Sequence, residues 1–192
     1  MKKVIGLTGG AASGKTTVSK FFKKLGAEVI NADLIGHVIQ REQETIDEIV
    51  ATFGEEVLSD TFIDRKKLGS IVFKDKKQLE KLNKIMHPRM YKRIASMINE
   101  SSNDIIILDM AILFEAGFND LCNEFIVIYS DTSLQMKRLL KRDHSKEIAE
   151  DILSMQLDIK EKIKLATYVI KNESTIFKLK KKVSNLFEYL KK

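Results

Sequence analysis

Short apolar runs alternate along the chain with longer stretches in which apolar residues recur every three or four positions. The short runs predict five strands, at residues 3–8, 27–33, 104–110, 124–130 and 166–172. The third run is almost continuous in isoleucine and leucine, which indicates a strand buried on both faces, as in a parallel sheet.

Helical spacing lies between and after these runs. Apolar residues from Val18 to Leu25 share one face of a predicted helix that ends at Gly26, a residue type that commonly caps helix C-termini. Further helices are predicted at about 133–142 and 176–190. Strands that alternate with helices predict an α/β fold in three layers, with helices on both sides of a five-stranded parallel sheet.

The gap between the second and third strands is too long for one crossover helix. Residues 42–102 are rich in charge and poor in glycine, and they predict a small helical region inserted into the sheet domain. The expected core of this single domain is therefore about 1–41, 103–135 and 155–192, and a lid is expected at about 136–154.

Composition narrows the class of protein. The chain has 192 residues, of which 44% are hydrophobic and 31% charged, and its net charge is +6. The single cysteine, Cys122, excludes a disulfide within the chain and is expected to be a buried, inert thiol. No targeting segment or membrane span is expected, so a cytoplasmic location is predicted. The positive charge fits nucleic acid or a phosphorylated small molecule, but much of it lies on the solvated face of the last helix.

The segment after the first strand carries the clearest chemistry. Gly9-x-x-x-x-Gly14-Lys15-Thr16 follows a strand and precedes a helix, which is the full P-loop pattern in its required context. Glycines let successive backbone N–H groups point at a phosphate, and the helix N-terminus adds partial positive charge. Lys15 is expected to reach the β- and γ-phosphates, and the Thr16 hydroxyl is expected to bind Mg²⁺. The expected ATP-binding residues of this segment are Gly9, Ala12, Ser13, Gly14, Lys15, Thr16 and Thr17.

A P-loop indicates a nucleoside triphosphate without specifying the reaction. The tetrapeptide at 83–86 reads Asn-Lys-Ile-Met, which lacks the aspartate of a guanine-specific Asn-Lys-x-Asp motif. The small size and the helical insert favour a P-loop kinase that acts on a small molecule. A regulatory or nucleic-acid-binding module is the alternative from another class, and another small-molecule or nucleoside monophosphate kinase is the nearest rival.

Two aspartates end predicted strands, where ligands of parallel sheets collect. Asp33 is a candidate general base that would orient and deprotonate the acceptor hydroxyl, and an N-cap of the next helix is an equally good interpretation. Asp109 is a candidate for the Mg²⁺ side of the site, favoured over a capping role.

Arginines on the helix at about 133–142 supply cations. Arg138 and Arg142 are four residues apart, so they share one helix face, as in a lid that closes over ATP. A solvated basic helix is the alternative. His87 lies before Pro88 in the insert, where a lone histidine is normally structural.

These segments together resemble the dephospho-CoA kinase family over nearly the whole chain. The resemblance rests on six segments: "IGLTGGAASGKTTV", "GAEVINADLIGHVI", "IDRKKLGSIVFKDKKQLEKLNKIMHPRM", "ILDMAILFEAGF", "RLLKRD" and "ATYVIKNEST". It implies transfer of phosphate from ATP, with Mg²⁺, to the ribose 3′-hydroxyl of dephospho-CoA, the last step of coenzyme A biosynthesis. ATP and dephospho-CoA are then the partners of a monomer or small homo-oligomer, without nucleic acid or membrane.

The resemblance also implies roles for individual residues. Asp33 becomes the base and contacts the acceptor, while Lys15 and Arg142 become catalytic contacts of the phosphates. Arg138 becomes a second lid contact, and Asn172 falls near the expected adenine-binding loop. The candidates for the acceptor side are Arg65, His87, Leu113, Phe114 and Glu115.

Four positions depart from the family pattern. Asn31 replaces the first aspartate of a usual Asp-Ala-Asp, which leaves Asp33 as the only carboxylate of that motif. Ala12 replaces a P-loop glycine, so its backbone is expected to take a conformation that alanine adopts. Ala111 replaces a usual proline, and Thr167 replaces a common aspartate.

Overall fold

Five parallel strands form one sheet in the order β2-β5-β1-β6-β7, which confirms the predicted α/β class. The strands are β1 (Lys3–Gly9), β2 (Glu28–Asn31), β5 (Ile105–Asp109), β6 (Glu124–Tyr129) and β7 (Tyr168–Lys171). β1 is central: the next two strands of the sheet along the chain, β2 and β5, lie to one side of it, and the last two, β6 and β7, lie to the other. This reversal of strand order places a ligand-binding switch point at the carboxyl end of β1.

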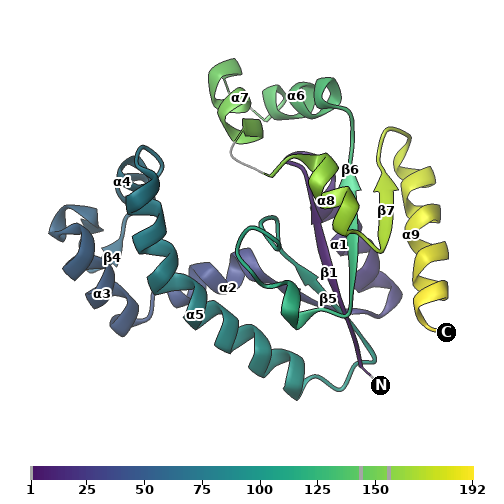
Figure 1. Cartoon of the computed structure of the whole chain (residues 1–192), viewed down its shortest axis with the longest axis horizontal. Helices are drawn as coiled ribbons and strands as arrows, with labels where there is room; N and C mark the ends of the chain where they lie inside the picture. The colour runs from purple at the N-terminus through teal and green to yellow at the C-terminus, as the bar shows by residue number, and fades with distance from the viewer. Residues whose placement is uncertain (1, 143–144, 155–156) are drawn as a thin grey trace. The chain divides into compact units, whose positions relative to one another are not determined.

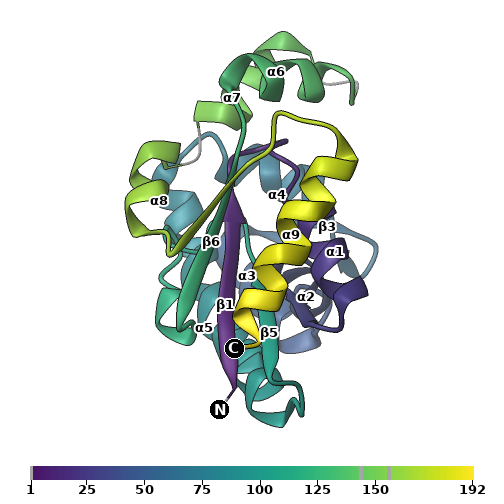
Figure 2. The ribbon, with the colours of Figure 1, turned by 90° about the vertical axis from the view of Figure 1, so that its right-hand side faces the viewer.

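Two helices cover one face of the sheet. α1 (Lys15–Leu25) and α9 (Ile176–Leu190) bury Phe22 and Phe187 against the apolar side chains of β1, β5, β6 and β7. Alternation along β1 turns Gly6 and Thr8 to the opposite face, where they meet the segment after β5. In Figure 2, α9 crosses in front of the sheet, and α8 (Ile159–Leu165) lies beside β6. The three predicted layers therefore follow from strand alternation and two apolar helix faces.

The computed structural model describes residues 2–142, 145–154 and 157–192, and the chain divides into two units (Figure 1). The sheet unit comprises Met1–Asn31 and Glu100–Lys192, and the helical unit comprises Ala32–Asn99. The sheet unit also contains η2 (Asn119–Leu121), α6 (Thr132–Leu140) and α7 (Lys146–Ser154).

Parts of the expected lid and core lie outside the described residues. These are residues 143–144 of the lid and residues 155–156 at the start of the last core segment. No helix in the described part of the chain is long and apolar enough to cross a membrane.

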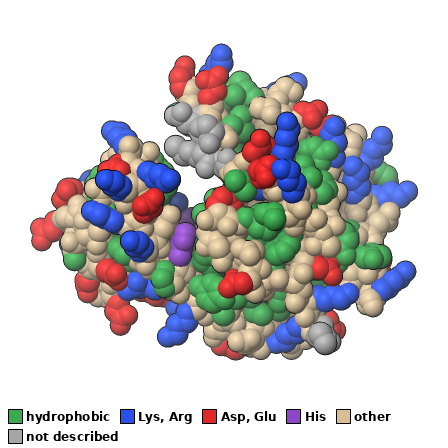
Figure 3. Space-filling model, in the orientation of Figure 1, with side chains coloured by type: hydrophobic (Ala, Val, Ile, Leu, Met, Phe, Trp, Pro, Cys, Tyr) green, Lys and Arg blue, Asp and Glu red, His purple; other side chains and the backbone are tan. Residues whose placement is uncertain are grey.

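The helical unit has its own apolar core. Its helices are α2 (Ala32–Ile39), α3 (Gln43–Phe53), α4 (Arg65–Val72) and α5 (Lys76–Glu100), which runs one residue past the unit. Ile49, Leu68 and Ile94 are among the side chains buried in this unit. Asp64 caps α4 by accepting hydrogen bonds from the N–H groups of Lys66 (2.8 Å) and Lys67 (3.2 Å). Lysine and arginine side chains gather over the α4 side of this unit (Figure 3).

Two features differ from the sequence prediction. β2 ends at Asn31, so Asp33 lies in the first turn of α2 rather than at a strand end. The reason is that Asn31 pairs with Asp109, the last residue of β5, and no strand partner continues beyond it. The predicted helical insert also contains η1 (Glu55–Val57) and a hairpin of β3 (Leu58–Ser59) and β4 (Phe62–Ile63). Strands of two residues are too short for a detectable period.

Candidate active site

The loop between β1 and α1 encloses a small pocket at the switch point. A cavity of about 110 Å³ is lined by Gly9–Thr17 together with Ala111 and Arg142. The structure thus brings all seven predicted P-loop residues around one space, with one of the two predicted arginines at its wall. The first turn of α1 follows directly, so the positive end of the helix dipole lies at this pocket.

The glycines of the loop are required by close packing. A Cβ at Gly9 would lie 2.2 Å from the Ile128 carbonyl oxygen. Gly14 has φ 101°, and a Cβ there would lie 2.3 Å from Asn172 Nδ2. Ala12 has φ 53°, which is the left-handed region and not the conformation that alanine prefers. This corrects the expectation for Ala12, because an alanine in that region costs about 1–2 kcal/mol.

Lys15, which lines this pocket, contacts the buried Asp109 behind it. The Lys15 ammonium donates a hydrogen bond to Asp109 Oδ1, and the Asp109 side chain is only 1% exposed. β5 ends at Asp109 beside β1, which is how the fold places this carboxylate next to the P-loop. The ion pair compensates the buried negative charge of Asp109 and holds Lys15 at the pocket.

The oxygen donors here suit Mg²⁺. Thr16 and Asp109 offer one hydroxyl and one carboxylate, and Mg²⁺ typically takes one or two protein oxygens and fills its other positions with water and phosphate oxygens. No group of three histidine, cysteine or acidic side chains that could hold a metal occurs among the residues that the structure describes. A closed protein metal site is therefore absent from that part of the chain, while a shared Mg²⁺–phosphate site fits.

Arg138 holds the P-loop from outside. Its guanidinium donates to the carbonyl oxygens of Ala12 (3.0 Å), Ser13 (3.3 Å) and Asn172 (3.1 Å) and to Ser130 Oγ (3.3 Å). In this structure the predicted phosphate contact is thus a support of the loop backbone.

Two amide side chains add to this support. Asn172 Nδ2 donates to the Ser13 carbonyl oxygen at 2.7 Å, and Gln135 Nε2 donates to the Ala11 carbonyl oxygen at 2.9 Å. Sequence reasoning missed Gln135, because nothing in its spacing on a basic helix distinguishes it. The Ser13 hydroxyl is buried and has no hydrogen-bond partner within the described residues, so this donor remains available.

Asp33 belongs to the helical unit and is exposed. It is the second residue of α2, so the N-cap interpretation does not fit the helix boundary. Its carboxylate makes no hydrogen bond or ion pair with any residue in the described ranges. The chain places it two residues after Asn31, which pairs with Asp109 in the sheet.

The three acceptor-side candidates after β5 have contacts of their own. Leu113 is fully buried beside Gly6, where an added Cβ would lie 2.6 Å from its Cδ2. The Phe114 ring lies 5.1 Å from the Phe125 ring, measured between centroids. Glu115 forms an ion pair with Lys162 of α8. This segment is therefore held firmly against the sheet.

Lys162 of α8 is a buried cation that sequence reasoning missed. Its side chain is fully buried, and its ammonium lies 2.7 Å from Glu115 Oε1 and 2.9 Å from the Ala111 carbonyl oxygen. Thr8 Oγ1 donates to the same Ala111 oxygen at 2.8 Å, and the Leu157 N–H donates to Glu115 at 3.2 Å. One buried ammonium therefore connects α8 to the wall of the phosphate pocket. In the sequence Lys162 is one of several lysines in a charged helix, and no sequence feature distinguishes it from the others.

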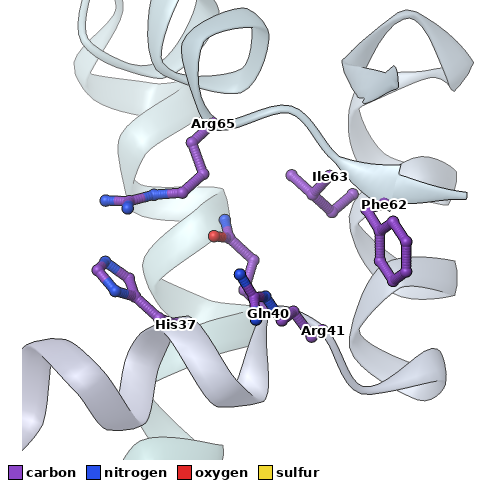
Figure 4. Close-up of a pocket in the computed structure, with 6 residues that line it drawn as sticks. All are labelled: His37, Gln40, Arg41, Phe62, Ile63 and Arg65. Atoms are coloured by element: carbon purple, nitrogen blue, oxygen red, sulfur yellow. The ribbon is translucent and has the colours of Figure 1, made fainter. Parts of the chain in front are cut away.

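The two remaining candidates, Arg65 and His87, lie in the helical unit. Arg65 begins α4 and lines a pocket of about 450 Å³ (Figure 4). His87 lies half-buried in α5, and burial lowers its pKa below 6.5. His87 is not among the residues that line this pocket.

The fold and the site define the class of protein. A P-loop at the centre of a parallel sheet, with a carboxylate at the end of the neighbouring strand, is the arrangement of a P-loop phosphotransferase. Solved structures share the fold: the Thermus thermophilus protein TT1252 superimposes with a TM-score of 0.87 at 24% identity, covering 98% of both chains. A dephospho-CoA kinase from Campylobacter jejuni gives a TM-score of 0.67 at 28% identity, covering 98% of this chain and 97% of the other.

Sequence comparison gives the family. The dephospho-CoA kinase family model matches residues 3–178. A dephospho-CoA kinase of Fusobacterium nucleatum is 42% identical over 187 residues, which are 96% of this chain and 97% of that protein. One of Aquifex aeolicus is 39% identical over 191 residues, which are 98% of this chain and 97% of that protein. The chain belongs to the dephospho-CoA kinase family, and it is an enzyme, a kinase.

Proposed function

We propose the following mechanism by which this kinase phosphorylates dephospho-CoA with ATP in coenzyme A biosynthesis. The γ-phosphoryl group of ATP passes in line to the ribose 3′-hydroxyl of dephospho-CoA, giving coenzyme A and ADP. The observation that carries this proposal is the P-loop pocket, whose lining residue Lys15 pairs with Asp109. Phosphoryl transfer needs positioning and positive charge more than covalent chemistry, and this pocket supplies both.

The P-loop residues bind the phosphates of ATP. Backbone N–H groups of the loop and the N-terminus of α1 face the β- and γ-phosphates, and the buried Ser13 hydroxyl is an additional donor. Lys15 then exchanges the Asp109 carboxylate for phosphate oxygens. Thr16 and Asp109 would hold Mg²⁺, which would neutralise charge on the phosphates.

Asp33 acts as the general base. It is a carboxylate without a partner in the described structure, and it follows the strand that pairs with Asp109. Asn31 cannot accept a proton at neutral pH, so Asp33 alone in this motif can take the proton of the 3′-hydroxyl as the phosphoryl group is transferred.

The two arginines have separate roles. Arg142 lines the phosphate pocket and would stabilise negative charge on the transferred group. Arg138 donates to three carbonyl oxygens and one hydroxyl, so it keeps the loop in its phosphate-binding shape. Residues 136–154 would act as a lid, and Asn172 would lie near the adenine.

Among the acceptor-side candidates, Arg65 and His87 belong to the helical unit and residues 113–115 belong to the sheet unit. Phe114 would contact the acceptor, whereas Leu113 and Glu115 would act through the segment that they hold in place. The helical unit would thus supply the anion-binding part of the acceptor site, with Arg65 as its first contact.

We also propose a cytoplasmic enzyme, monomeric or a small homo-oligomer, that binds neither nucleic acid nor membrane. Cys122 is only partly buried, which corrects the expectation of a buried thiol. Desolvation and the nearby Asp120 nevertheless raise the pKa of this thiol to about 12, so it is a poor nucleophile at neutral pH. This fits a protein that neither forms disulfides nor uses thiol chemistry.

The test is ADP release from Mg·ATP with dephospho-CoA, AMP, adenosine or no acceptor. ADP formation that depends on dephospho-CoA is the expected result. Turnover with another acceptor alone would favour the rival small-molecule kinase. ATP binding without any acceptor-dependent ADP, together with salt-sensitive binding of nucleic acid, would favour the regulatory module.

A further inference from the structure

Only two charged side chains are buried among the residues that the structure describes, and both lie near the phosphate pocket. They are Asp109, which pairs with Lys15, and Lys162, which pairs with Glu115. A buried charge costs free energy unless it is paired, and replacing a buried ion pair by apolar residues often leaves a protein as stable as before. Stability alone therefore does not explain why α8 carries an ammonium at this position.

The first group that Lys162 holds is a wall of the phosphate pocket. Ala111, which follows the end of β5, lines the cavity of about 110 Å³ together with the P-loop. Its carbonyl oxygen accepts hydrogen bonds from Lys162 Nζ at 2.9 Å and from Thr8 Oγ1 at 2.8 Å. Thr8 is on β1 and Lys162 is on α8, so this wall is fixed from two elements that are far apart in the sequence. The position of Ala111 relative to the loop depends on both donors.

The second group is the Glu115 carboxylate, which connects the wall to the chain that follows α7. Glu115 Oε1 lies 2.7 Å from Lys162 Nζ and accepts a hydrogen bond from the Leu157 N–H at 3.2 Å. Leu157 lines a second cavity, of about 210 Å³, together with Gly10 and Ala11 of the P-loop. Figure 2 shows α8 beside β6, and α7 precedes it in the chain. The ion pair therefore holds the chain just after the proposed lid next to the first residues of the loop.

We propose that Lys162 is a positioning residue for phosphoryl transfer. Its ammonium keeps Ala111 and Glu115 in one arrangement, so the wall of the phosphate pocket and the end of the lid hold a fixed place beside the P-loop while ATP reacts. An ammonium offers three donors at one point, so it can serve a carbonyl oxygen and a carboxylate oxygen at once, which an apolar side chain cannot do. The inference rests on the proposed function and adds a residue that acts through its neighbours, not on the substrates.

The experiment measures steady-state kinetics of the whole chain with Mg·ATP and dephospho-CoA. Lys162→Met should lower kcat about 10- to 100-fold, because a displacement of about 1 Å at the reacting groups costs a comparable factor. The KM for dephospho-CoA and the Kd for ADP should stay within about twofold, since the contacts that bind both ground states remain. A purely structural role predicts instead a parent-like kcat for the folded protein.

Two matched controls separate position from stability. Lys164→Met removes an exposed lysine of the same helix. Val183→Ala shortens a fully buried side chain of α9 that is not among the residues lining the phosphate pocket, and it lowers stability through lost packing. Both variants should keep the kcat of the parent.

The double variant Lys162→Met with Glu115→Met separates the two roles in one protein. It removes both charges, so its urea midpoint should lie closer to the parent's than that of Lys162→Met does. Its kcat should remain as low as that of Lys162→Met, because Ala111 regains no second donor and Leu157 regains no acceptor. With a non-hydrolysable ATP analogue bound, amide exchange in α7 should be faster in the double variant than in the parent. The double variant also provides the kinetic measurement if Lys162→Met alone does not fold.

Three results would overturn the inference. A parent-like kcat in the double variant is one, and a fall in the kcat of Val183→Ala equal to that of Lys162→Met is another. The third is equal amide exchange in α7 of the double variant and of the parent. In all three cases the parent enzyme still turns over dephospho-CoA, so the proposed function would stand. A parent enzyme that does not phosphorylate dephospho-CoA would contradict the proposed function itself.

Discussion

Asp33 is the residue on which the proposed chemistry depends most. Its carboxylate has no partner within the described chain. Asn31, two residues earlier, is uncharged and cannot act as a second base. Asp33→Asn keeps the shape and removes the base, so kcat should fall about 10²- to 10⁴-fold while ATP affinity stays within about twofold. Steady-state kinetics and ATP titration measure both. Glu44→Gln, at an exposed carboxylate in the first turn of α3, is the control, and a parent-like kcat in Asp33→Asn would remove Asp33 from the base role.

Ala12 and Gly14, two loop residues with positive φ, should change the stability of the protein in opposite directions when each is substituted. Ala12→Gly removes a side chain from φ 53° and should stabilise the protein by about 0.5–1 kcal/mol after the greater entropy of the unfolded glycine is counted. Gly14→Ala places a Cβ at φ 101° and 2.3 Å from Asn172, so it should destabilise by about 2 kcal/mol or more. Urea unfolding compares them. Equal effects of the same sign would show that backbone conformation does not decide stability here.

His87 should make stability depend on pH. Burial lowers its pKa in the folded protein below 6.5, so between that lowered pKa and 6.5 the unfolded chain binds more protons. The free energy of unfolding therefore falls as the pH falls through this window. His87→Gln should reduce the difference in unfolding free energy between pH 7 and pH 5, measured by urea titration. The parent and the variant share the other two histidines, so their contribution cancels in the comparison. The same dependence of unfolding free energy on pH in parent and variant would contradict the prediction.

At the scale of elements, α8 is connected to the sheet unit's pocket by one buried charge. Lys162→Met leaves Glu115 without its cation and Ala111 without one of two donors, so the loss should be about 2–3 kcal/mol. Lys164→Met removes an exposed lysine of the same helix that pairs with Glu161, and it should leave the free energy of unfolding almost unchanged because solvent screens this pair.

Urea unfolding of both variants measures this difference. The double variant Lys162→Met with Glu115→Met should recover part of the loss, because the unpaired carboxylate is then gone. A Lys162→Met protein as stable as Lys164→Met would show that the buried pair contributes nothing.

At the scale of the molecule, the two units should respond to different substrates. A non-hydrolysable ATP analogue should slow amide exchange in the loop 9–17 and in α6 of the sheet unit. Dephospho-CoA should slow exchange mainly over residues 37–65 of the helical unit, where the basic pocket lies. At 100 times its Kd, each ligand should stabilise the protein by about 2.7 kcal/mol.

Hydrogen exchange followed by mass spectrometry measures this division, with the C-terminal half of α9 as an internal reference. Protection of the sheet unit alone by dephospho-CoA would contradict the role of the helical unit.

The sequence by itself determined the five strands, the P-loop and the position of Asp109. These depend on local features: apolar period, glycines at fixed spacing and the end of an apolar run. The acceptor-side residues could be suggested only by resemblance to the family, because no local pattern marks them.

Tertiary structure decided the rest. It ended β2 at Asn31, because the partner strand ends there, and so moved Asp33 into a helix. It paired Lys162 with Glu115, 47 residues earlier, and turned Arg138 onto carbonyl oxygens more than a hundred residues away. It also joined the end of α2, the hairpin and α4 into one basic pocket. Each of these depends on which distant segments meet, and a pattern read over a few turns of chain contains no such information.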